Sequence, residues 1–155
     1  MKGAKVVLVA VHWTRIDDVL DLAGDLAGKT VITCSLPMTK DDSALAVGHT
    51  SSGAEKLAAK IPDAYVVSAF SSTPSEVLSG VFEAKGSQPR PTLIYCGDDD
   101  AAKVTAAKLI SDLGFEPLDA GALQTARYLE PFSLLVAQIA YDGGSPEVSY
   151  RVERQ

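Results

Sequence analysis

The sequence predicts an α/β domain built on a doubly wound, parallel, Rossmann-like sheet. Two observations carry this prediction: short runs rich in valine and isoleucine alternate with amphipathic segments, and glycines close several of those segments. Right-handed crossovers between parallel strands place helices on both faces of such a sheet. With 155 residues, 46% of them hydrophobic, the chain suits one domain spanning residues 1–155.

The first half of the chain predicts three strands and two helices. The apolar run Ala4–Val11 predicts a fully buried strand. The helix that follows has a capping pair at Thr14 and Asp17 and a plausible stop at Gly28. Its apolar face carries Ile16, Val19, Leu20, Ala23 and Leu26. The remaining elements are a strand over Thr30–Cys34, a helix over about Gly53–Lys60 and a strand over Ala64–Phe70.

The second half continues the alternation. Helical turns around Ser75–Phe82 precede a strand over Thr92–Cys96 and a helix that Gly114 closes. The apolar face of that helix carries Ala102, Ala106, Leu109, Ile110 and Leu113. The last elements are a short strand over Pro117–Ala120, a helix over Thr125–Tyr141 that Pro131 starts or kinks, and an edge strand in "EVSYRVER".

Charge and composition exclude several classes of partner. The net charge is −6, so a nucleic acid or an anionic membrane surface is not an expected partner. The first apolar run is too short to span a membrane and lacks a cleavage site, which predicts a cytoplasmic protein. Cys34 and Cys96 each end a strand and are expected to be buried, reduced thiols. The two histidines, His12 and His49, have no partners at metal-ligand spacing.

Ligands of open α/β sheets bind beyond the carboxyl ends of the strands, which directs attention to "VHWT", "CSLPM" and "FSST". There Trp13 either stacks on a flat cofactor ring or packs its helix onto the sheet. His12 can donate a hydrogen bond to a ligand. Pro37 either holds the backbone rigid beside a ligand or serves ordinary turn chemistry.

Two further stretches have a structural explanation. "GHTSSGAEK" resembles a phosphate loop, but Ser52 and Glu55 form a capping box and the Gly-Lys-Ser/Thr ending is missing. "GDDD" carries acids that interact favourably with a helix dipole, which is favoured over cation binding. No Ser–His–Asp or Cys–His arrangement is apparent, so no catalytic residue is assigned.

Several motifs extend from about Ala4 nearly to the C-terminus: "VVLVAVHW", "ITCSLPM", "CGDDD" followed by "LDAGAL", and "RYLEP". Together they resemble the NADP oxidoreductases that depend on the deazaflavin coenzyme F(420). That family transfers a hydride between NADP and the deazaflavin, so the resemblance implies NADP as cofactor. The family's G-x-G-x-x-G loop has no counterpart in this sequence. The resemblance therefore implies weak or absent NADP binding by this chain alone.

The resemblance also implies site residues. The nicotinamide side is expected at Val11, His12 and Trp13 after the first strand, where His12 replaces a common proline. A second set follows the next strand, at Ser35, Leu36 and Pro37. The deazaflavin side is expected at Phe70 and Ser71, and Ser71 stands where coenzyme-reducing members carry histidine.

Two functions of different classes stay open at this point. The first is an NADP-dependent oxidoreductase that transfers a hydride to a deazaflavin-like or other small acceptor, impaired as an isolated chain. The second is a non-catalytic α/β module or subunit that has lost the dinucleotide-phosphate site. Relative to the family the chain is expected to lack the N-terminal half. A short gene product, a misplaced start codon and one piece of a two-piece protein are all compatible with this.

A homodimer is expected, because "VVLVAV" would otherwise form a long unpaired apolar edge. A second apolar face for the same assembly is expected on the C-terminal helix, at Leu129, Phe132, Leu135 and Ile139. The alternative is that the C-terminal segment folds back and covers the edge within one chain.

Overall fold

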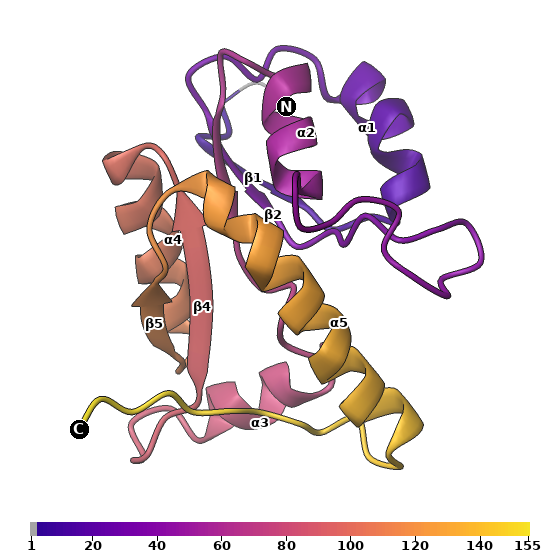
Figure 1. Ribbon diagram of the computed structural model, residues 1–155. Helices are drawn as coiled ribbons and strands as arrows, with labels where there is room; N and C mark the ends of the chain where they lie inside the picture. Colours follow the sequence, from indigo (N-terminus) through magenta and orange to yellow (C-terminus); the bar gives the residue numbers. More distant parts are fainter. Residues whose placement is uncertain (1–2) are drawn as a thin grey trace.

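A computed structural model describes residues 3–155 and contains one five-stranded sheet in the order β1-β2-β3-β4-β5 (Figure 1). The strands are β1 (Val6–Val9), β2 (Thr30–Thr33), β3 (Tyr65–Ser68), β4 (Thr92–Gly97) and β5 (Glu116–Asp119). The helices are α1 (Ile16–Ala23), α2 (Gly53–Lys60), α3 (Val77–Glu83), α4 (Asp100–Asp112) and α5 (Ala126–Asp142). Two 3₁₀ turns, η1 (Trp13–Arg15) and η2 (Leu123–Thr125), precede α1 and α5.

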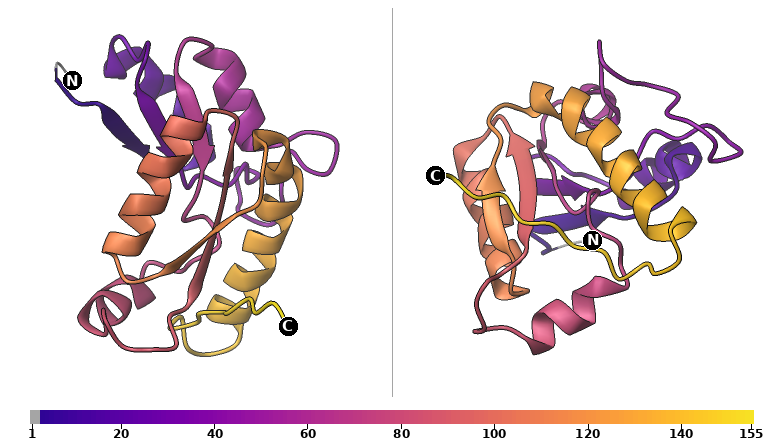
Figure 2. Two further views of the ribbon diagram at one scale, coloured as in Figure 1. Left: turned by 90° about the vertical axis from the view of Figure 1, so that its left-hand side faces the viewer. Right: turned by 60° about the horizontal axis from the view of Figure 1, so that its bottom comes forward.

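Apolar residues on the two faces of the sheet form two separate cores, which confirms the doubly wound α/β fold. Neighbouring strand residues point to opposite faces, so Val31 joins one core and Ile32 the other. The first core lies under α1, α2 and α5, and the second lies under α3 and α4. Figure 2 shows these helices on either side of the strands.

The expectation of a fully parallel sheet is wrong at one junction. β3 and β4 pair antiparallel, through Val67 with Gly97 and Ser68 with Cys96, whereas the other three strand pairs are parallel. The reason lies in the connection. α3 has only seven residues and does not cross back over the sheet, and β4 then runs up from the α3 side (Figure 1).

The first strand is half-buried, which corrects the expectation of a fully buried strand. Val7 and Val9 pack into the first core, but Val6 is 36% exposed and Leu8 is 58% exposed. β1 pairs only with β2, and α4 packs over β2 to β5 without covering β1. One edge and one face of β1 are therefore free of cover by the described residues.

Helix ends agree with the sequence where local chemistry decides them. α2 spans the expected residues, and α4 ends before Gly114, whose φ is +103°. Other ends differ. Thr14 and Asp17 do not cap α1, which ends at Ala23 before Gly24. Gly28, with a φ of +69°, instead turns the chain into β2.

Three further expectations about the second half need correction. The last helix begins at Ala126 and continues through Pro131, so the proline does not start it. Leu109 of α4 is 40% exposed because the buried face of that helix consists of Ala102, Ala106 and Ile110. The segment "EVSYRVER" forms no strand.

The C-terminal segment is anchored beside β4 by Tyr150. The Thr92 N–H donates to the Tyr150 carbonyl (2.8 Å), and the Tyr150 hydroxyl bonds Ser72 Oγ (2.6 Å). The Tyr150 ring packs edge-on against Phe132, with 5.1 Å between ring centroids. This segment therefore covers the gap beside the start of β4. The alternative that it covers the edge of β1 is wrong.

We expect Tyr150→Ala to lower the free energy of unfolding by about 2 kcal/mol, because a half-buried ring and its hydrogen bond are lost. Urea denaturation followed by circular dichroism measures this. Tyr128→Ala, on the exposed side of α5, is the control and should change stability by less than about 0.5 kcal/mol. Equal losses in both variants would contradict the anchoring role.

Candidate functional site

The loops after β1 and β2 meet at the carboxyl ends of these strands and form a cavity of about 290 Å³. Ala10 to Trp13, Cys34 to Leu36 and Met38 line it. Five of the six residues predicted for the nicotinamide side are therefore found together: Val11, His12, Trp13, Ser35 and Leu36. We call this cavity the donor pocket, after the nicotinamide side that the sequence resemblance implies for its residues.

Hydrogen bonds hold the two loops of the donor pocket together. Ser35 Oγ donates to the Val11 carbonyl (2.6 Å), and the Cys34 N–H donates to the Val9 carbonyl (3.2 Å). Trp13 packs against the first core, which confirms its expected packing role, and it also lines the pocket, where stacking on a ring stays a prediction. Burial raises the pKa of the Cys34 thiol, which is free, as is buried Cys96.

Pro37 does not face the donor pocket. It is buried beneath the start of α2, where a Cβ added to Gly53 would lie only 3.1 Å from its ring. A side chain at position 53 would require Pro37 to shift by a few tenths of an ångström. Pro37 therefore packs beneath α2 and does not line the donor pocket, whereas its predicted ligand contact stays a prediction.

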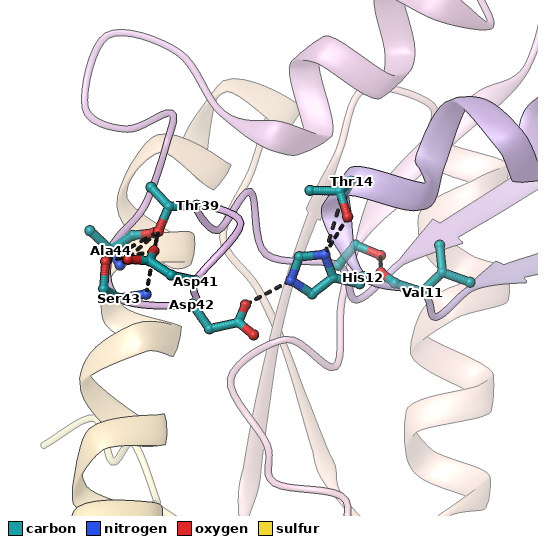
Figure 3. Close-up of polar contacts among 9 residues, drawn as sticks. Val11, His12, Thr14, Thr39, Asp41, Asp42, Ser43 and Ala44 are labelled. Carbon is teal, nitrogen blue, oxygen red and sulfur yellow. Dashed lines mark hydrogen bonds and ion pairs between the residues drawn. The ribbon is translucent and has the colours of Figure 1, made fainter.

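His12 joins the two sides of the donor pocket through both ring nitrogens (Figure 3). Nδ1 lies 2.8 Å from Thr14 Oγ1 and accepts the Thr14 N–H (3.3 Å), so His12 caps the 3₁₀ turn η1. Nε2 lies 2.7 Å from Asp42 Oδ1. Since Nδ1 accepts a backbone N–H, the proton sits on Nε2 and is donated to Asp42.

Asp42 was not predicted, because it lies thirty residues from His12 in an irregular loop. Its neighbour Asp41 organises this loop by accepting hydrogen bonds from the Thr39 and Ser43 hydroxyls. These hydrogen bonds lower the pKa of Asp41 to about 2, and the bond from Thr39 is the largest cause, followed by those from Ser43. The resulting turn holds Asp42 at a φ of +56° and directs its carboxylate toward His12 (Figure 3).

A second cavity of about 190 Å³ shares one lining residue, Leu36, with the first. We call it the acceptor pocket. Its polar groups are hydroxyls: Ser71 Oγ and Ser133 Oγ lie 3.0 Å apart, and Ser72 and Tyr141 also line it. Of the two residues predicted for the acceptor side, Ser71 lies here. Phe70, with a φ of +69°, instead packs against the second core.

The start of α2 is capped as predicted, with an addition that the sequence did not reveal. Ser52 Oγ accepts the Glu55 N–H (3.1 Å) and donates to the Glu55 carboxylate (2.7 Å). The Gly53 and Ala54 N–H groups donate to the two carboxylate oxygens of Glu130, at 2.8 and 3.0 Å. All three N–H groups of this turn thus have partners within the chain, and "GHTSSGAEK" is a cap.

Glu130 lies on α5 and is 1% exposed. Loss of hydration on burial raises its pKa to about 7, although the two backbone N–H groups act in the opposite direction and Glu55 adds a smaller increase. One turn earlier on α5, Arg127 makes a two-pronged ion pair with Glu55, with Nη2 2.7 Å from Oε1. This pair lowers the pKa of Glu55. Two adjacent polar contacts therefore fasten α5 to the start of α2.

The acidic stretch before α4 also has partners within the chain. Asp99 Oδ1 accepts the Ala102 N–H (2.8 Å) and caps α4, and Asp98 Oδ1 accepts the Leu123 N–H (2.8 Å). Over residues 3–155, no group of three or more His, Cys, Asp or Glu side chains is arranged to hold a metal ion. Within the same range, no helix is long and apolar enough to cross a membrane.

Comparison with known proteins agrees with this fold. No family model matches the chain. Metalloreductase STEAP3 of Rattus norvegicus is 33% identical over 134 residues, covering 86% of this chain and 26% of that protein. Metalloreductase STEAP2 of Homo sapiens is 28% identical over 130 residues, or 83% and 24% of the two chains. The chain thus spans about a quarter of the length of these curated relatives.

Solved structures extend the likeness over nearly the whole chain. A putative F420-dependent NADP-reductase from Arthrobacter sp. FB24 superposes with a TM-score of 0.86 at 24% identity, covering 98% of this chain and 70% of that one. A hypothetical protein from Sinorhizobium meliloti gives 0.71, also at 24% identity, with 97% and 68% covered. The predicted Rossmann-like fold and the resemblance to F420-dependent NADP reductases are confirmed at the level of the fold.

Because of Glu130, the free energy of unfolding should fall as the pH rises, whereas a typical carboxylate with a lowered pKa makes it rise. Its pKa is raised from 4.5 to about 7, so the folded state holds this proton more tightly than the unfolded state. The contribution is therefore greatest below pH 4.5 and is lost as the pH rises to about 7. Glu130→Gln, which does not titrate, should flatten this part of the curve by up to about 3 kcal/mol.

Urea unfolding at several pH values between 4.5 and 7.5 measures the effect, with Glu147→Gln at an exposed position as the control. An identical pH profile in Glu130→Gln and the unsubstituted protein would contradict this assignment. Glu55 does not interfere with this measurement. Because its pKa is lowered, the stability that Glu55 contributes is lost only as the pH falls below the ordinary carboxyl range.

Proposed function

We propose that this chain is the ring-binding part of an NADP-dependent oxidoreductase, in which a hydride passes from nicotinamide to a small planar acceptor. The observation that carries the proposal is the pair of cavities sharing Leu36 at the carboxyl ends of the strands. Rings bound in these two cavities would both contact the Leu36 side chain. Hydride transfer requires donor and acceptor rings to lie close together and needs no acid–base side chain.

The residues of the donor pocket fit a nicotinamide ring. Trp13 and Leu36 line the pocket and offer apolar surface for the faces of the ring. NADP supplies the hydride when bound. The chain's own residues would orient the ring and exclude water, and the Ser35 and His12 contacts would hold the two loops at a fixed separation.

The phosphates of NADP fit the described residues poorly. Helix N-termini are the usual phosphate sites, but α2 is capped by Glu130 and Ser52 and α4 by Asp99. In η1, the Thr14 and Arg15 N–H groups are taken by the His12 side chain and carbonyl. We therefore infer that NADP binds weakly and that its affinity depends on contacts with the nicotinamide ring.

The acceptor pocket favours a neutral ring that forms hydrogen bonds, because its lining consists of hydroxyls and apolar groups. A deazaflavin or another small redox ring meets this description. The metalloreductase names of the curated relatives suggest that electrons in those proteins finally reach a metal ion. We propose that the direct acceptor of the hydride is an organic ring, since a metal ion does not take up a hydride from nicotinamide in one step.

We expect NADPH to bind weakly, with any saturable signal depending on Trp13. NADPH fluorescence titration, with reduced nicotinamide mononucleotide as a second ligand, measures both points. Trp13→Leu should abolish binding of both ligands, whereas Leu22→Ala, on the exposed side of α1, should leave it unchanged.

Saturable low-micromolar NADPH binding, or binding that survives Trp13→Leu, would contradict the proposed pocket. Loss of all binding in the unsubstituted protein would instead favour the second candidate, a non-catalytic α/β module or a subunit that another polypeptide completes.

We also propose that β1 pairs with β1 of a second copy in a two-fold contact. β1 bonds β2 through alternate residues, as in the bond from the Thr30 N–H to the Lys5 carbonyl. The N–H and C=O groups of Val6 and Leu8 therefore face outward. Antiparallel pairing would satisfy them and cover their exposed side chains.

The expected second contact through α5 is not part of this proposal. Leu129 of the expected apolar face is buried in the first core, while Leu135 and Ile139 are exposed. Figure 2 (left) shows β1 and α5 on different sides of the molecule.

Leu8→Lys should convert the dimer to a monomer of 16.3 kDa, because it places a charge on the exposed face of β1. Light scattering after gel filtration measures the mass. Leu22→Lys on α1 is the matched control and should leave the dimer intact. Val9 is unsuitable because it is buried and a lysine there would unfold the chain. A monomer at micromolar concentration without any substitution would refute the dimer.

A further inference from the structure

A cleft of about 550 Å³ lies between the start of α1 and α2 and shares only Trp13 with the donor pocket. Its lining includes Trp13, Ile16, Asp17, Val47, Lys56 and Lys60. Figure 1 shows α1 and α2 side by side at the top of the molecule. We call this cavity the Trp13 cleft. Its volume lies within the range of small-molecule sites.

The Trp13 cleft is positively charged in a chain whose net charge is −6. Lys56 and Lys60 are four residues apart on α2 and therefore share one helix face. Lys60 Nζ pairs with Asp17 Oδ1 at 2.7 Å, which neutralises one of the two charges. No carboxylate within residues 3–155 forms an ion pair with Lys56. One ammonium thus remains available to an anion.

The other end of the α1–α2 groove has the opposite character. A separate cavity there is lined by Asp21, Asp25 and Asp63, together with Lys60. An anion would be repelled at that end and attracted at the Lys56 end. The part of the groove that can attract an anion, at Lys56, therefore lies beside Trp13, the only tryptophan of the chain.

We infer that the Trp13 cleft binds a planar organic anion, a flat ring carrying one phosphate or carboxylate. The indole of Trp13 and the side chain of Val47 provide apolar surface for the ring. Lys56 provides the charge for the anionic group, and Lys60 a weaker second one. This inference is independent of the proposed hydride transfer. Because Trp13 also lines the donor pocket, a ligand in the cleft would contact a residue of that pocket.

The fluorescence of the single tryptophan reports on both the Trp13 cleft and the donor pocket, and the variants below separate the two. The probes are AMP and benzoate, which combine a ring with an anion, together with adenosine and inorganic phosphate, which each carry one of the two. AMP, benzoate or both should change the tryptophan fluorescence saturably. Adenosine and inorganic phosphate should bind about tenfold more weakly. A response to AMP alone indicates a nucleotide ligand, and one to benzoate alone a carboxylate.

Lys56→Gln should weaken binding of the responding probe about tenfold, since one charge-assisted contact is lost. Lys108→Gln is the matched control, because it removes the same charge from α4 on the other side of the sheet. Met38→Ala changes the donor pocket alone and should leave the affinity unchanged.

Three outcomes would overturn the inference: no saturable signal with AMP or benzoate, equal affinity in the Lys56→Gln and Lys108→Gln variants, or loss of binding in Met38→Ala alone. The last outcome would move the ligand into the donor pocket. Circular dichroism of each variant establishes that it is folded. Weak NADPH binding does not bear on this test, so the two proposals fail separately.

Discussion

The carboxylate of Glu130 at the start of α2 is the contact on which the candidate site depends. It accepts the Gly53 and Ala54 N–H groups from inside the protein, where these donors would otherwise have no water to bond. The contact fixes α5 against α2. Gly53 in turn packs on Pro37, and Pro37 directly follows Leu36, which lines both pockets. A residue distant in the sequence thus sets the position of the loop that lines both pockets.

The same contact limits the chemistry that this part of the molecule can offer. A helix N-terminus attracts anions through its free N–H groups and its dipole, and here the chain's own acids occupy that role at α2 and α4. The cavities beside the sheet therefore suit flat, mostly apolar groups. The positive charge near Trp13 comes from the side chain of Lys56 and not from a helix N-terminus.

The antiparallel junction between β3 and β4 shapes the second pocket. β4 meets β3 only through Cys96 and Gly97, so the rest of β4 lies beyond the end of β3. The C-terminal segment and α5 fill the space beside it, with Tyr150 reaching Ser72 and Ser133 reaching Ser71. Hydroxyl groups from three distant segments are brought together in this way. A fully parallel sheet would have placed a helix over this gap.

The sequence by itself determined the fold class, most strand positions, the exact bounds of α2 and the grouping of five donor-pocket residues. These features follow from local chemistry: apolar periodicity, a Ser52 cap, and the rule that strand ends meet at one edge. Only the tertiary structure decided the roles of Asp42, Glu130 and Pro37, as well as the direction of β4. Each of these depends on a partner at least sixteen residues away, and no local pattern specifies which partner will be near.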